Sequence, residues 1–149
     1  MTFAASANPI AYLGATPIFI DSEEKTLNLC PLQLRKAIED RISKGKKPKA
    51  IIAVHLYGMP YQVEKINEIA REFDITVIED AAEALGSTYK GGKCGTFAEC
   101  AILSFNGNKI ITAGGGGAIL TNSDDLADYA KHITTTAKIA HQYEYEHDE

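Results

Sequence analysis

Short apolar runs alternate along this chain with stretches in which apolar residues recur every third or fourth position. The short runs are typical of strands buried on both faces of a parallel sheet, and the longer spacing is typical of amphipathic helices. Their alternation predicts an α/β fold with a mainly parallel central sheet. We expect strands over residues 17–21, 50–54, 75–79, 100–105 and 118–120, and helices over residues 31–43, over residues 61–73 and after residue 123.

Two of the predicted helices begin with residues that favour a helix start. Pro31 suits the first turn, where its missing N–H is not needed, and the predicted buried face then carries Leu34, Ile38 and Ile42. Ser123 is a candidate N-cap, and the buried stripe that follows it carries Leu126, Ala130 and Ile133. A helical start is also expected over residues 2–9.

Length and composition restrict the class of protein. With 149 residues the chain has the size of one domain, and its net charge of −5 argues against a nucleic-acid binder. No apolar stretch is long enough for a transmembrane helix, so no membrane partner is expected. Three cysteines without CxxC spacing indicate reduced thiols and a cytoplasmic protein. The polar residues 143–149 and the abrupt helical start suggest a chain cut at both ends.

Two chemically important residues follow apolar strands. Asp80 comes directly after the strand predicted over 75–79, and Lys109 follows the strand predicted over 100–105. Ligands of open α/β sheets bind beyond the carboxyl ends of the strands. An amine and a carboxylate at neighbouring strand ends suit pyridoxal phosphate, because the amine forms a Schiff base with the aldehyde and the carboxylate keeps the pyridine nitrogen protonated. The alternatives are a turn cap for Asp80 and an ordinary surface lysine for Lys109.

Further candidates lie near this pair in the sequence. Glu83 follows Asp80 closely enough for the two carboxylates to share a metal, although the stretch contains no histidine. The Ser104 hydroxyl can donate to a phosphate oxygen or bond locally. The glycines at 114–117 form either a flexible turn or a close backbone approach to a cofactor or to the preceding strand. His55 has no partner motif, and we interpret it as structural.

Five stretches together resemble the DegT/DnrJ/EryC1/StrS family of sugar aminotransferases. They occur in the family's order and cover nearly the whole chain, at residues 2–8, 14–21, 55–58, 78–86 and 104–109. The resemblance implies the aspartate aminotransferase fold (fold type I), a three-layer α/β sandwich, and pyridoxal 5'-phosphate as cofactor. On this resemblance, residues 1–149 are the central part of the large, cofactor-binding domain.

The resemblance also implies individual roles. Lys109 matches the lysine that forms the Schiff base and shuttles a proton, and Asp80 matches the partner of the pyridine nitrogen. The other cofactor-binding candidates are Phe3, stacked on the ring, Glu83, near the cofactor hydroxyl, Ser104, on the phosphate, and Asn106, in the segment before the lysine. Glu83, the Asn-Gly-Asn segment and the glycine run resemble the subgroup that acts on UDP-4-keto-6-deoxy-N-acetylhexosamines. The implied substrates are a keto-sugar nucleotide and an amino donor, glutamate, in a homodimer.

Three alternatives to this prediction remain open. Family members are much longer, and the Gly-Thr helix start that cradles the phosphate is expected before residue 1, so a non-catalytic fragment is an alternative. A pyridoxamine-dependent sugar dehydratase of the same family is a second, although those enzymes carry histidine where this chain has Lys109. A metal hydrolase that uses Asp80 and Glu83 is a distant third.

Overall fold

The fold described here is that of a computed structural model, which describes residues 1–140 and 145–147. Its helices are α1 (Asn8–Tyr12), α2 (Pro31–Ser43), α3 (Val63–Glu72) and α4 (Asp124–Thr134), with 3-10 turns η1 (Ala4–Ser6) and η2 (Leu56–Gly58). Its strands are β1 (Ala50–Val54), β2 (Thr76–Asp80), β3 (Thr88–Tyr89), β4 (Gly92–Lys93), β5 (Cys100–Ser104), β6 (Gly117–Thr121), β7 (Lys138–Ala140) and β8 (Tyr145–His147).

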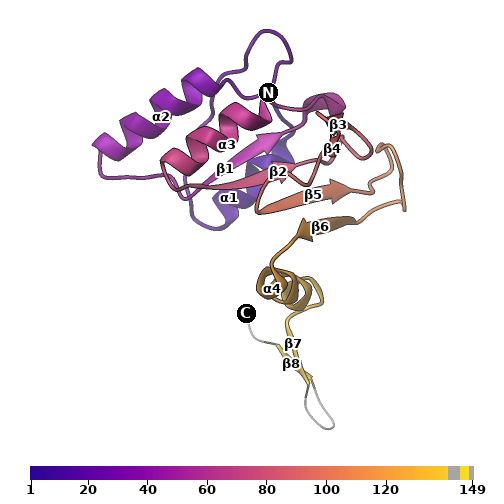
Figure 1. The fold of residues 1–149 in the computed structure, drawn as a ribbon. Coiled ribbons are helices and arrows are strands. Elements are labelled where there is room, and N and C mark those ends of the chain that lie inside the picture. The colour runs from indigo at the N-terminus through magenta and orange to yellow at the C-terminus, as the bar shows by residue number, and fades with distance from the viewer. Residues whose placement is uncertain (141–144, 148–149) are drawn as a thin grey trace.

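The main sheet has four strands in the order β1-β2-β5-β6 (Figure 1). The pairs β1–β2 and β2–β5 are parallel, whereas β5 and β6 are antiparallel. The chain crosses over through α3 between β1 and β2, but it turns straight back after β5, and a direct return makes an antiparallel pair. The predicted α/β fold with a mainly parallel sheet is therefore confirmed.

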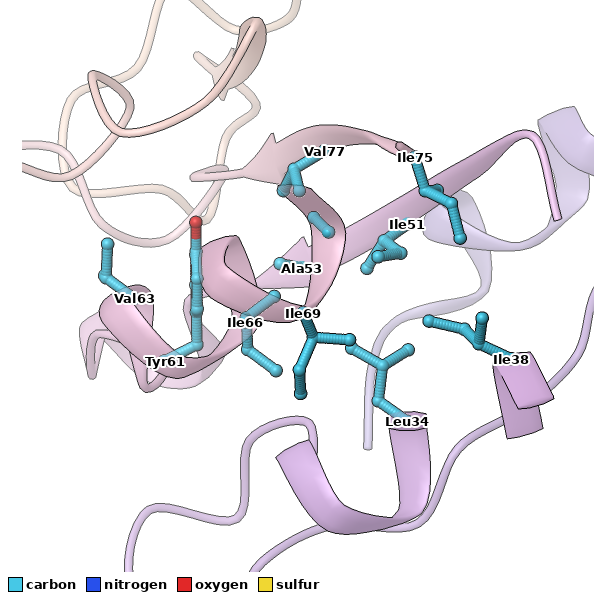
Figure 2. Close-up of a cluster of buried hydrophobic side chains, with 11 residues drawn as sticks. Leu34, Ile38, Ile51, Ala53, Tyr61, Val63, Ile66, Ile69, Ile75 and Val77 are labelled. Atoms are coloured by element: carbon cyan, nitrogen blue, oxygen red, sulfur yellow. The ribbon is translucent and has the colours of Figure 1, made fainter. Parts of the chain in front are cut away.

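One face of the sheet carries the hydrophobic core. Helices α2 and α3 lie together on this side of β1 and β2 (Figure 1). Figure 2 shows how their side chains meet those of the strands. The buried cluster consists of Leu34, Ile38, Ile51, Ala53, Tyr61, Val63, Ile66, Ile69, Ala70, Ile75 and Val77. Both helices therefore bury the faces that their apolar spacing predicts, with one exception given below.

The opposite face of the sheet is more open. Turn η1 and helix α1 lie on this side, across β1 and β2 from α3 (Figure 1). The strands alternate accordingly, since every second residue of β1, β2 and β5 is buried while those between are partly or fully exposed. Ile102 on β5 is 43% exposed, and Ile119, its antiparallel partner on β6, is 47% exposed.

The strand predicted over residues 17–21 is wrong. Among residues 1–140 and 145–147 this segment pairs with no strand, and an isolated bridge joins Ser22 to Leu29. Ile18 and Phe19 are exposed, and residues 18–21 line a shallow groove beside α2. An apolar run becomes a strand only where a sheet edge offers it hydrogen bonds, and this run lies beside a helix instead.

The buried stripes of two helices are shorter than predicted. Ile42 at the end of α2 is exposed, and on α4 Ala130 is buried while Ile133 is exposed. Helix α4 packs against β6 and lies with β7 and β8 beyond that edge of the sheet (Figure 1). One edge strand cannot cover a whole helical stripe. The predicted N-cap is confirmed, because the Ser123 hydroxyl accepts a hydrogen bond from the Leu126 amide at 3.2 Å.

The predicted ends of the chain are only partly correct. The helical start predicted over residues 2–9 is split into a 3-10 turn and a short helix that contains Pro9. Of the predicted polar tail, residues 145–147 form β8, which pairs antiparallel with β7, and residues 143–144 and 148–149 lie outside the described residues. Among the described helices, none is long and apolar enough to span a bilayer.

Candidate active site at the carboxyl edge of the sheet

The predicted site residues come from two neighbouring strands. Asp80 is the last residue of β2 and pairs in register with Ile102 of β5, so Ser104, at the end of β5, lies two residues further along. Residues two apart in a strand point to the same side. Asp80 and Ser104 therefore both belong to the open face of the sheet, at its carboxyl edge.

Two hydrogen bonds hold the carboxylate of Asp80. Its Oδ1 accepts from the amide of Ala82 at 3.2 Å, which closes a local turn. Its Oδ2 accepts from the hydroxyl of Ser6 at 2.6 Å. A carboxylate oxygen can accept two hydrogen bonds, so each oxygen keeps capacity for a ligand. A simple turn cap, the alternative role for Asp80, accounts for the hydrogen bond of Oδ1 but not for that of Oδ2.

Lys109 forms an ion pair with Glu83. Its Nζ lies 3.4 Å from Oε1 of Glu83, and the side chains are 14% and 35% exposed. The other oxygen, Oε2, accepts from the amide of Tyr57 at 2.9 Å. Tyr57 has a φ of +50°, a left-handed conformation that turns its amide toward the carboxylate. Lys109 is thus a shielded amine held by a long ionic contact, not a free surface lysine.

Beneath this edge lies a second, fully buried carboxylate. Glu79 accepts from Nε2 of His55 at 2.8 Å, from the amide of Gly95 at 2.8 Å and from the amide of Phe97. Burial alone would raise the pKa of Glu79, but these hydrogen bonds outweigh it and hold that pKa below its usual range. His55, itself fully buried and stacked on Tyr61, is structural, as predicted.

The glycine run combines the two predicted interpretations. Gly114 and Gly116 have positive φ, and an added Cβ at residues 114–116 would meet nothing within 4 Å, as expected for an open turn. At Gly117 an added Cβ would stand 2.4 Å from the carbonyl oxygen of Leu103. The first three glycines therefore make the turn, and the fourth allows β6 to lie close against the backbone of β5.

Some of the candidate site residues do not contact the others in the structure. The side chain of Asn106 donates to Asn108 at 3.1 Å within its own turn, and the amide of Asn106 donates to the hydroxyl of Ser104 at 3.3 Å. Phe3 precedes η1, and its side chain is 77% exposed. The roles of Phe3, Ser104 and Asn106 toward a cofactor stay predictions.

The carboxylates of Asp80 and Glu83 face different partners. One is held by Ser6 and the other by Lys109 and the Tyr57 amide. Across residues 1–140 and 145–147, no group of three or more His, Cys, Asp or Glu side chains is arranged to hold a metal ion.

Sequence reasoning missed Ser6 and the backbone of Tyr57. Ser6 lies 74 residues from the carboxylate it contacts. No local pattern connects residues so far apart, and serine is common near helix starts. Only its position could have indicated Ser6, because Ser6 lies in the same short stretch as the candidate Phe3.

Together, the mainly parallel sheet, Asp80 at the end of β2 and the pair of Lys109 with Glu83 define an α/β domain with a shielded amine held by one carboxylate. A model of the DegT/DnrJ/EryC1/StrS aminotransferase family matches residues 1–149. The chain belongs to this family.

Individual relatives agree with this assignment. The chain is 46% identical over 137 residues to EpsN of Bacillus subtilis, covering 92% of this chain and 35% of EpsN. It is 50% identical over 127 residues to GDP-perosamine synthase of Caulobacter vibrioides, covering 85% of this chain and 33% of that protein. A DegT/DnrJ/EryC1/StrS aminotransferase structure from Brucella abortus superposes with a TM-score of 0.90 at 36% identity, covering 98% of this chain and 40% of that one. The chain thus spans about a third of the two sequence relatives' length.

Proposed function

We propose that this chain carries the lysine and cofactor site of a pyridoxal phosphate-dependent aminotransferase that moves an amino group to a keto-sugar nucleotide. The observation that supports this most is the shielded Lys109 paired with Glu83, at the sheet edge where β2 presents Asp80. EpsN is named as a pyridoxal phosphate-dependent aminotransferase, and another relative is named GDP-perosamine synthase. The first name matches the predicted cofactor, and the second contains a nucleotide sugar, the predicted class of substrate.

The residues present fit the cofactor chemically. Pyridoxal phosphate, when bound, supplies an aldehyde for an amine and a ring that withdraws electrons. The 3.4 Å contact of Lys109 with Glu83 is long for an ion pair, so the amine can leave it at small cost. Asp80 keeps free acceptor positions for a protonated pyridine nitrogen, and the half-buried hydroxyl of Ser104 is available at the adjacent strand end.

Each residue would then have a role toward the cofactor. Lys109 would hold the aldehyde group and serve as the base that moves a proton during amino transfer. Asp80 would hold the protonated pyridine nitrogen, and Glu83 would orient the amine. Ser104 would donate to the phosphate, and Phe3 would cover one face of the ring. Asn106, two residues after Ser104, would shape the segment that carries Lys109.

The finer assignments belong to the same proposal. We propose glutamate as the amino donor and a UDP-4-keto-6-deoxy-N-acetylhexosamine as the acceptor, with residues 1–149 as part of the cofactor-binding domain. A homodimer is expected from the resemblance, and a cytoplasmic location from the cysteine usage. The free thiols of Cys30, Cys94 and Cys100 support a reducing compartment.

Borohydride reduction in the presence of pyridoxal phosphate, followed by peptide mass mapping, tests the proposal. A reduced adduct on Lys109 is the expected result, and Lys109→Ala should lose it. Lys90→Ala is the matched control, because Lys90 is an exposed lysine that also pairs with a glutamate, Glu64. Adducts scattered over exposed lysines, or an unchanged adduct pattern in Lys109→Ala, would contradict the proposal.

A further inference from the structure

In the described part of the chain, the hydroxyl of Ser6 is the one group distant in sequence that hydrogen-bonds to the carboxylate of Asp80. It donates to Oδ2 at 2.6 Å, whereas Oδ1 is bonded only within the local turn, by the amide of Ala82. A second hydroxyl, Oγ1 of Thr2, lies 2.6 Å from the Ser6 oxygen. Two hydroxyls from the N-terminal turn therefore lead to the carboxylate at the end of β2.

The direction of this chain of hydrogen bonds follows from counting protons. A serine hydroxyl has one proton, and an ionised carboxylate can only accept. Because Ser6 gives its proton to Asp80, it must accept from Thr2. The order Thr2 to Ser6 to Asp80 aligns the O–H groups, and aligned hydrogen bonds strengthen one another.

Turn η1 holds Ser6 in place for this contact. The amide of Ser6 bonds to the carbonyl of Phe3 at 3.1 Å, and the amide of Ala7 bonds to the carbonyl of Ala4 at 3.0 Å. The turn therefore carries Phe3 at its beginning and Ser6 at its end. An exposed aromatic ring and the donor to Asp80 are separated by one turn of backbone.

We propose that Ser6 is a positioning residue that fixes the Asp80 carboxylate for the pyridine nitrogen, with Thr2 as its support. This inference rests on the proposed function. With Oδ2 tied to η1 and Oδ1 tied to Ala82, the carboxylate cannot rotate away from the open face of the sheet. The same turn then sets both the ring contact of Phe3 and the nitrogen contact of Asp80.

The test compares two cofactors in the purified protein. Pyridoxal phosphate has the ring nitrogen, and its 1-deaza analogue has carbon in that place, so Asp80 can hold only the first. Loss of a hydrogen bond to a charged group predicts a Kd for pyridoxal phosphate about tenfold higher in Ser6→Ala. The Kd for the deaza analogue should not change. Nitrogen-15 NMR of labelled pyridoxal phosphate should show a weaker pyridinium signal in the same variant.

Matched variants separate positioning from folding. Ser6→Thr keeps the hydroxyl and should restore the wild-type ratio of the two Kd values. Thr2→Val should show a smaller change, because water can replace an exposed donor. Ser43→Ala, which removes an exposed hydroxyl on α2, should have no effect. In an Asp80→Ala background, Ser6→Ala should add nothing.

The remaining outcomes overturn the inference in distinguishable ways. Equal weakening for both cofactors would mean that Ser6 only supports the fold, and unchanged Kd values would mean that the contact is irrelevant to binding. Either result would leave the proposed function intact as long as wild-type protein forms the Lys109 adduct. A wild-type protein that binds neither cofactor would overturn the proposed function and this inference together.

Discussion

The two faces of the central sheet are formed by the same strands but differ in how deeply their side chains are buried. On the face beneath α2 and α3, alternate residues are fully buried, and even the polar ones are enclosed. On the other face, the residues between them are partly exposed, and this face carries Asp80 and Ser104. Strand alternation thus separates the buried core residues from the candidate cofactor-binding residues by a single position.

Glu79 and Asp80 show this contrast between neighbours. Glu79 faces the core, is 0% exposed and serves three donors that hold the end of β1 and the loop after β4. Asp80 is half-buried on the open face, with acceptor capacity left for a ligand. The two adjacent acidic residues therefore differ in environment, because the carboxylate of Glu79 is fully enclosed by its donors and that of Asp80 is not.

The largest expected effect is that of removing the buried carboxylate. Glu79→Ala leaves the ring nitrogen of His55 and two amides without an acceptor, and such a loss costs about 3–5 kcal/mol of unfolding free energy. Urea denaturation measures it. Asp80→Asn is the control on the open face and should cost less than about 1 kcal/mol. Equal costs for the two variants would contradict the distinction between the faces.

Apolar residues should show the same contrast. Ile66 is 0% exposed and lies in the core cluster, so Ile66→Ala should cost about 2–5 kcal/mol. Ile102→Ala removes the same atoms from a half-exposed position and should cost less than about 1 kcal/mol. Thermal or urea unfolding of the two variants measures both costs. A large cost for Ile102→Ala would show that the open face is covered in the folded protein.

The glycine turn offers a smaller test. Gly117→Ala would force a Cβ against the carbonyl oxygen of Leu103, so β5 and β6 must separate, at a cost of about 1–3 kcal/mol. Gly115→Ala meets nothing within 4 Å and should change stability by less than about 0.5 kcal/mol. If the two substitutions cost the same, the close approach at Gly117 is not what requires glycine.

The smallest effect is confined to acidic pH. The pKa of Glu79 is lowered in the folded protein, so its contribution to stability is fully present above its unfolded pKa, about 4.3. That contribution is lost as the pH falls through the lower, folded pKa. The stability difference between wild type and Glu79→Gln should therefore be constant near neutral pH and shrink below about pH 4. A difference that grows on acidification would contradict the lowered pKa.

The local pattern of apolar residues in the sequence determined much of the secondary structure of this protein. The apolar spacing of residues 31–43 and 61–73 predicted α2 and α3 to within two residues at each end. The continuous apolar runs predicted four of the five expected strands, and with them the positions of Asp80 at the end of β2 and of Lys109 after β5. These features follow from neighbours in sequence, since helix and strand periodicity are local properties.

Only the tertiary structure decided which residues meet. The run over 17–21 has the composition of a strand but finds no sheet edge, and the sequence Ile-Glu-Asp at 78–80 does not say which carboxylate is buried. The contact between Ser6 and Asp80 joins residues 74 positions apart. Such contacts depend on how elements pack, because the energy of burial and hydrogen bonding is set by the surrounding chain and not by the residue's own neighbours.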